Sequence, residues 1–334
     1  MSKTPLSILD LAPIVQGSTP AQALANATDI ARHADRWGYN RYWLAEHHNM
    51  TGIASAATSV VIGHIAANTS RIRVGAGGIM LPNHAPLVIA EQFGTLESLY
   101  PGRIDLGLGR APGTDQFTAR ALRRNMGDSD DSFPQDVLEL QGYFQPAQPG
   151  QPVQAVPGAG LNVPIWLLGS SLFSAELAAH LGLPYAFASH FAPRYLLRAV
   201  DLYRSRFKPS AALEKPYVMV AANAIAADTD EEAHFLFSSL RHRFARIARG
   251  IRGPLQPPSN DYEKDWTHGE RDFADDATAC SAVGSPDVIR KGLEHLQAET
   301  GADELIVTAQ VFDHAARRNS FKLVAETWGL TADQ

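Results

Sequence analysis

The stretch RIRVGAGGIMLPNHAPLVIAEQFGTLESLYPGRIDLGLGRAPG, residues Arg71–Gly113, decides the expected fold. Its apolar beginning predicts a buried strand that contains three closely spaced glycines, Gly75, Gly77 and Gly78. Because glycine has no Cβ, a flat ligand could lie against the backbone there. An apolar helix and a second short strand follow, and the stretch ends in a loop that carries Arg110. Strand, helix and strand in this order predict the repeat of a parallel α/β fold.

The same alternation continues through the chain, in which each predicted strand is followed by a predicted helix. The predicted strands are 6–13, 39–46, 72 onward, 103–109, 164–168, 185–189, 216–227 and 303–309. Eight such units in 334 residues match an α/β fold of the (β/α)8 TIM-barrel type with insertions, here a single domain over residues 1–334. The alternative is an open doubly wound sheet, which requires a switch point that the sequence does not reveal.

Two segments interrupt this alternation. Residues 145–160 are rich in Pro, Gly and Gln, and we interpret them as a surface excursion inside the one domain, because strand and helix patterns resume directly after them. Residues 250–276 are Pro-rich, charged and aromatic, without an apolar period. Loops of this length are usually functional or disordered, so the segment is a candidate lid.

Composition narrows the class of protein. The net charge of -6 argues against nucleic acid or an anionic membrane as the main partner. The single cysteine, Cys280, excludes an intrachain disulfide and fits a reducing compartment. Neither a signal-peptide core nor an apolar run of ~18 residues is present. We therefore expect a soluble cytoplasmic protein with no membrane partner.

The histidine pair His47–His48 follows Glu46 at the end of the second predicted strand. Successive residues of a strand point to opposite faces, so the pair is a poor chelator, and we expect no metal. One imidazole at the mouth of a barrel could instead give or take a proton near neutral pH, and His47 is the candidate catalytic residue. The plain alternative is a turn in which both histidines are hydrogen-bonded.

Two features suggest an anion site. Ser170, Ser171 and Ser174 stand at the start of a predicted helix, where free N–H groups and the helix dipole favour a phosphate. The alternative is ordinary N-capping. Arg110 could serve the same anion or form a surface salt bridge with Asp115, and the sequence leaves this open.

Four ordered motifs together resemble the bacterial luciferase-like flavin monooxygenase family, and most closely its single-chain oxidoreductases of unassigned substrate. The motifs are Trp43–His48, Gly75–Pro82, Leu106–Gly113 and the serine segment 169–174. The resemblance runs over almost the whole chain.

The resemblance implies a (β/α)8 barrel, usually dimeric, which binds FMN at its C-terminal mouth. It implies that the flavin ring lies against Gly77 and Gly78, which a non-proline cis peptide often joins, and that His47 is the active-site histidine. The phosphate would then lie near Arg110, Ser170, Ser171 and Ser174. The sequence departs from the family at Ser170, which replaces an acidic residue, and at a second phosphate arginine, which is Arg123, Arg124 or absent.

The implied reaction is a monooxygenation. FMNH2 from a separate flavin reductase would react with O2 through a C4a-hydroperoxyflavin and oxidise a small organic substrate. The alternatives on the same fold are F420-dependent hydride transfer and non-catalytic flavin binding.

Overall fold

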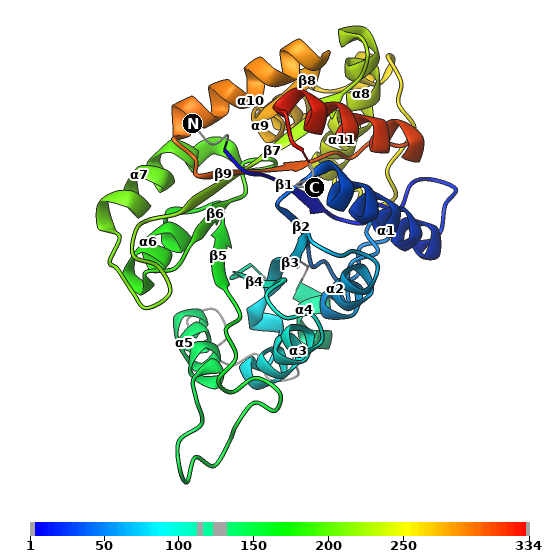
Figure 1. The fold of residues 1–334 in the computed structure, drawn as a ribbon. Helices are drawn as coiled ribbons and strands as arrows, with labels where there is room; N and C mark the ends of the chain where they lie inside the picture. Colours follow the sequence, from blue (N-terminus) through cyan, green and yellow to red (C-terminus); the bar gives the residue numbers. More distant parts are fainter. Residues whose placement is uncertain (1–3, 112–115, 123–131, 332–334) are drawn as a thin grey trace.

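Eight parallel strands close into a barrel with helices outside it (Figure 1). The computed structural model describes residues 4–111, 116–122 and 132–331. The barrel is closed because β7 pairs with both β6 and β9, and β9 in turn pairs with β1. The barrel strands are β1 (Leu6–Asp10), β2 (Arg41–Leu44), β3 (Arg73–Met80), β4 (Ile104–Gly109), β5 (Ile165–Gly169), β6 (Tyr185–Phe187), β7 (Val218–Ala226) and β9 (Glu304–Thr308). The predicted (β/α)8 barrel is confirmed, and the open-sheet alternative is wrong.

A ninth strand, β8 (Ser281–Gly284), was not among the eight predicted ones. It pairs with the C-terminal half of β7, from Asn223 to Ala226, beyond the part of β7 that contacts β6. Its four residues, one of them glycine, are too few to show an alternating pattern.

The first helix begins and ends at residues that commonly cap helices. Thr19 caps α1 by accepting a hydrogen bond from the Gln22 N–H, and Gly38 ends that helix in a left-handed conformation. No helix in the described part of the chain combines the length and apolarity that crossing a bilayer requires. The helices are α1 (Pro20–Trp37), α2 (Thr58–Ala67), α3 (Pro86–Leu99), α4 (Gln116–Leu122), α5 (Phe133–Phe144), α6 (Leu172–Leu181), α7 (Leu196–Arg206), α8 (Asp230–Ala248), α9 (His268–Ala277), α10 (Pro286–Thr300) and α11 (His314–Trp328).

The barrel interior is filled by side chains. Trp43 and Trp166 meet edge to face with ring centroids 5.2 Å apart, and both are buried. Leu9, Met219 and Ile306 pack in the same cluster. The barrel is therefore a packed core, and a ligand has room only at one of its ends.

The N-terminal end is closed by four charged side chains, which we call the barrel floor: Arg41, Arg73, Asp105 and Glu304. Arg41 lies 2.8 Å from an oxygen of Asp105 and 2.9 Å from an oxygen of Glu304, and Arg73 lies 2.6 Å from the other oxygen of Asp105. Both carboxylates are fully buried. Two acids thus balance two arginines, and this end has no charge left for a ligand.

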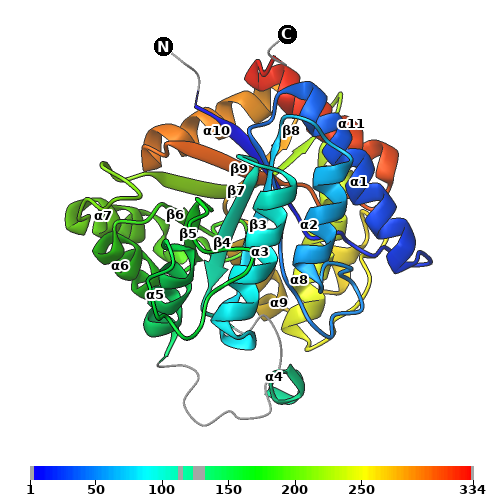
Figure 2. The same ribbon diagram turned by 60° about the horizontal axis from the view of Figure 1, so that its bottom comes forward.

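The two interrupting segments differ from each other. Residues 145–160 project from the barrel between α5 and β5 (Figure 1), and Ala155 returns into the core. Residues 250–276 are not a structureless loop, because they contain a short 3-10 turn (Tyr262–Asp265) and most of α9, which packs beside α8 (Figure 2). The Thr267–Glu270 capping box that starts α9 fits the Thr-x-x-Glu pattern, a signal that the sequence offered.

Candidate functional site

The sequence candidates converge at the C-terminal end of the barrel. His47 follows β2, Gly77 and Gly78 lie in β3, Arg110 follows β4, and the serines follow β5. Because the strands are parallel, the loops after them meet at the same end, which is where barrel enzymes carry their active sites. The structure therefore brings all the predicted site residues to one mouth.

The peptide bond between Gly77 and Gly78 is cis, as the resemblance implies. A Cβ on Gly77 would stand 2.8 Å from Leu9 Cδ1, and one on Gly78 would stand 2.7 Å from the carbonyl oxygen of Gly107. Glycine is therefore required here by the packing of the barrel wall itself.

The N-terminus of α6 is open to an anion. Ser171 is its N-cap residue and makes no side-chain capping bond. The Ser174 hydroxyl donates to the Ser171 carbonyl at 3.0 Å and lies 3.3 Å from the Tyr185 hydroxyl. N-capping by these serines, the alternative considered above, is thus wrong. The first N–H groups of the helix keep their donor capacity for an outside acceptor.

Arg110 lies beside this helix end. It is exposed, and its guanidinium carbon stands 4.2 Å from the ring centroid of Phe173, in the first turn of α6. Its alternative partner, Asp115, lies outside the described residues, as do Arg123 and Arg124. A guanidinium beside an uncapped helix N-terminus fits the chemistry of a phosphate group.

His47 is half-buried at the mouth. Its backbone N–H donates a hydrogen bond to the Ser55 carbonyl at 3.1 Å. Its ring Nδ1 is buried and has no hydrogen-bond partner among the described residues. Burial, and then the positive charge of Arg243, lower the pKa of His47 to about 4. The imidazole is therefore neutral at pH 7 and can accept a proton.

A second histidine at the mouth, His190, was missed from the sequence. It follows β6, is 8% exposed, and its Nδ1 also has no partner in the described part of the chain. Burial, and then His47, lower its pKa to about 4. Its place after a predicted strand was a signal, because every strand of a parallel barrel ends at the same mouth.

Acid is expected to destabilise the fold through His47 and His190. Each folded-state pKa is about 4, below the usual 6.5, so between these values the unfolded chain binds a proton that the folded chain does not. Stability is then lost as the pH falls through this window, by about 2 kcal/mol per histidine on going from about pH 7.5 to about pH 5. Urea unfolding at both pH values measures this loss.

The variant His190→Gln serves as the control for that measurement. It removes one titrating imidazole and should reduce the acid-dependent loss by about 2 kcal/mol. An unchanged loss in this variant contradicts the assignment of the loss to His190.

Glu46, His48 and His84 form a separate polar group at the mouth. One oxygen of Glu46 lies 2.8 Å from Nε2 of both histidines, and the other accepts a hydrogen bond from the Met80 N–H at 3.2 Å. The ligand atoms of the three residues lie within 4.8 Å of one another, so the group could hold a metal ion. The sequence argument against a metal considered only His47 with His48 and did not anticipate this group.

Two relatives are similar over most of their length. A luciferase-like monooxygenase of Escherichia coli (strain K12) is 57% identical over 320 residues, which cover 96% of both chains. An N-acetyl-S-alkylcysteine monooxygenase of Bacillus subtilis (strain 168) is 36% identical over 240 residues, which cover 68% of this chain and 69% of that one.

Solved structures share the fold. The crystal structure of apo-MsnO8 superposes with a TM-score of 0.88 at 37% identity and covers 98% of this chain and 99% of its own. Two others show the fold alone. They are the oxygenating constituent of a 3,6-diketocamphane monooxygenase from Pseudomonas putida in complex with FMN (TM-score 0.72, 18% identity, 97% of both chains) and an F420-dependent secondary alcohol dehydrogenase (TM-score 0.71, 15% identity, 98% and 99%).

The family model described as luciferase-like monooxygenase matches residues 4–304, which include every candidate site residue. Together with the relative at 57% identity, this match shows that the chain belongs to the luciferase-like monooxygenase family.

Proposed function

We propose that the chain is a flavin-dependent monooxygenase that uses FMNH2 and O2 to oxidise a small organic substrate. The observation that carries the proposal is Arg110 lying over Phe173 at the uncapped start of α6. This arrangement offers a cation and free N–H donors to one phosphate, at the end of the barrel where His47 also lies.

Each site residue has a proposed part in holding the cofactor. Arg110 and the helix N-terminus after Ser170 and Ser171 bind the phosphate, while Ser174 fixes the local backbone by its bond to the Ser171 carbonyl. The Gly77–Gly78 segment of β3 provides a backbone surface against which the flavin ring lies. Bound in this way, the reduced flavin supplies the electrons that activate dioxygen.

The chain itself supplies the proton chemistry and the exclusion of water. His47 is neutral and accepts a proton at its unpartnered Nδ1. The segment 250–276 covers part of the mouth, since the Leu255 backbone pairs with Ile14 and Gln16 in the loop after β1 and the Leu255 side chain is fully buried. A covered mouth keeps water from the reduced cofactor.

The proposal includes two partners. A separate flavin reductase delivers FMNH2, directly or through free flavin, and a second copy of this chain forms a homodimer. Both partners are proposed from family likeness. Sedimentation of the purified chain tests whether it is a homodimer.

The direct test is incorporation of oxygen from labelled dioxygen. The chain is incubated with FMN, NADH, a flavin reductase and ¹⁸O2, together with aldehydes, sulfonates, ketones, aromatics and an N-acetyl-S-alkylcysteine. The last compound is included because a relative is named for it. We expect ¹⁸O in one organic product, and only when both proteins are present. Absence of labelled product throughout, with flavin bound, favours a non-catalytic flavin protein.

Replacing Arg110 by glutamine tests the phosphate site. Loss of one charge-assisted contact is expected to weaken FMN binding by about 10- to 100-fold. Riboflavin, which has the same ring without the phosphate, is the matched control, and its affinity should not change. If riboflavin and FMN lose affinity equally, Arg110 does not contact the phosphate. If the unmutated chain binds F420 more tightly than FMN, hydride transfer is the favoured function.

A further inference from the structure

Three arginines gather at one side of the mouth, and we call them the mouth arginines: Arg243, Arg246 and Arg252. They line a cavity of about 10 Å³, which has room for about one water molecule. Its other walls are mostly apolar or backbone, and they comprise Met50, Gly52, Ile247, Ile251 and Gly253. The cavity therefore combines positive charge with an apolar lining.

Among the described residues, the mouth arginines have no acidic partner. Arg243 donates to the amide oxygen of Gln310, and Arg246 donates to the Pro254 carbonyl at 3.4 Å. Over the described residues, none of the three is in a salt bridge. Neutral acceptors orient these guanidinium groups without cancelling their charge.

Several other arginines of the molecule are in salt bridges, and one of them lies on the same helix as Arg243 and Arg246. On α8, Arg241 pairs with Glu263 and Asp275, and Arg249, which follows the last residue of α8, pairs with Glu270. On the barrel floor, two arginines face two buried carboxylates. Within the described residues, Arg243 therefore differs from Arg241 on the same helix, because no acid pairs with it.

A desolvated cation without a counter-ion is costly to keep in a folded protein. Burial lowers the pKa of Arg243 to about 10, so its side chain remains charged at neutral pH. A site that tolerates this cost is suited to an anion that comes from outside.

The neighbouring histidines do not supply that anion. His47 is close enough for Arg243 and Arg252 to lower its pKa, and His47 in turn lowers the pKa of His190. Both imidazoles have a buried Nδ1 without a partner among the described residues. The group that enters this corner therefore meets positive charge and two imidazoles with open hydrogen-bonding capacity.

The phosphate of the flavin has its own proposed place. Arg110 and α6 follow β4 and β5, whereas Arg243 contacts Gln310, which follows β9, and shares a cavity with Gly52, which follows β2. The two positive regions belong to different parts of the barrel wall. One ligand phosphate accounts for one of them.

We propose that the substrate is an organic anion, a carboxylate or a sulfonate, whose charged group is bound by Arg243 with Arg252 beside it. This inference rests on the proposed function and names its substrate class. The charged head lies against these guanidinium groups beside the small cavity, and the part of the substrate that is oxidised extends toward His47. Specificity then comes from a cation whose charge only the correct substrate neutralises.

Calorimetric titration with matched probes tests the inference. The probes are hexanoate, hexanesulfonate, hexanamide and hexanol, added at low ionic strength to the flavin-loaded chain. We expect both anions to bind about 10- to 100-fold more tightly than the two neutral probes, since hydrogen bonds to charged groups are the stronger ones. Equal affinity for hexanoate and hexanamide, or no anion binding even at about 100 mM, overturns the inference.

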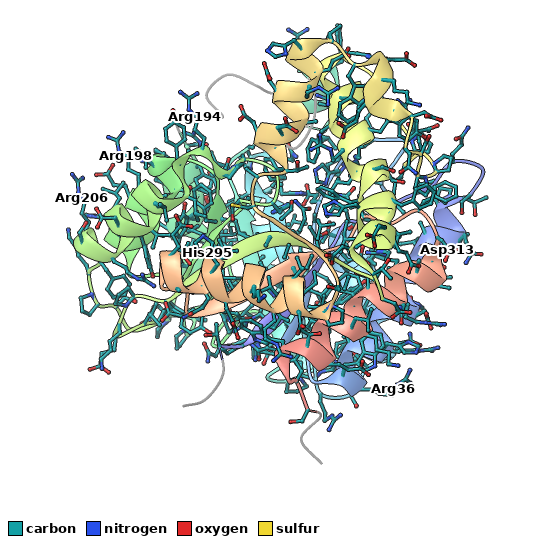
Figure 3. The ribbon with its side chains drawn as sticks, turned by 90° about the horizontal axis from the view of Figure 1, so that it is seen from above. Arg36, Arg194, Arg198, Arg206, His295 and Asp313 are labelled. Atoms are coloured by element: carbon teal, nitrogen blue, oxygen red, sulfur yellow. The ribbon has the colours of Figure 1, made fainter. Side chains whose placement is uncertain are left out.

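Variants assign the effect to the arginines. Arg243→Gln should abolish the preference for anions without changing hexanamide or FMN affinity, Arg243→Lys should keep part of it, and Arg252→Gln should weaken it less. The exposed Arg198 on α7 points away from the barrel (Figure 3), so Arg198→Gln is the charge control and should bind like the unmutated chain. A preference retained in Arg243→Gln, or a loss of FMN affinity alone, overturns the inference.

The two proposals can fail separately. The titrations are repeated without flavin, so a chain that binds no flavin refutes the proposed function while the anion preference is still measured. If Arg243→Gln does not fold, Arg252→Gln and Arg243→Lys report on the same preference, and neither removes a buried charge.

Discussion

Replacing His47 by alanine is expected to slow formation of the oxygenated product by about 100- to 10,000-fold, the range in which a positioned acid or base contributes to catalysis. The imidazole is neutral because burial and Arg243 lower its pKa to about 4, and its unpartnered Nδ1 is the candidate proton acceptor. Alanine removes that acceptor and leaves the barrel wall in place. Product formation with a saturating supply of FMNH2 measures the effect, and the rate at which oxygen reoxidises the bound reduced flavin measures it independently of the substrate.

The control for this variant is His64→Ala. His64 is an exposed histidine in the last turn of α2, and its replacement should leave both rates unchanged. FMN affinity is measured for each variant, so that loss of cofactor is not mistaken for loss of chemistry. Full turnover in His47→Ala, with flavin bound, removes His47 from the catalytic site.

Replacing Asp105 by alanine is expected to lower the free energy of unfolding by about 3–5 kcal/mol, the cost of removing one partner from a buried ion pair. This carboxylate accepts from Arg41, Arg73 and the Trp43 indole N–H, and it is fully buried. Its loss leaves two guanidinium groups with one acid, Glu304, between them. Urea unfolding near pH 7 measures the change.

An exposed ion pair provides the comparison. Glu176 on α6 pairs with Arg206 on α7, and both side chains are more than half exposed. Figure 3 shows Arg206 at the outer edge of the molecule. Glu176→Gln should change the unfolding free energy by no more than about 1 kcal/mol. If Asp105→Ala costs no more than this control, the floor is not a significant source of stability.

Most of the fold could be predicted from the sequence, because its local signals agree with the final structure. The buried strands read as continuous apolar runs, and Thr19 and Gly38 mark the two ends of α1. β8 was missed because four residues carry no period, and α9 was missed because its composition is polar. The Thr267–Glu270 capping box was the available sign of α9.

The site could be predicted only in part. Position after a strand was enough to gather His47, Arg110 and the serines at one mouth. Nothing local to the sequence shows that Arg243 has no acidic partner among the described residues while Arg241, two residues earlier on the same helix, has two. Such pairing depends on which elements the fold brings together, and it becomes visible only in three dimensions.

The segment over the mouth is attached differently from the floor. Arg241 and Arg249 bind it through Glu263, Asp275 and Glu270, and these pairs are partly open to solvent. Dissolved ions weaken contacts of this kind over about 8 Å at physiological strength, whereas a buried network is shielded from them. A high salt concentration is therefore expected to loosen the segment over the mouth while the barrel floor stays rigid.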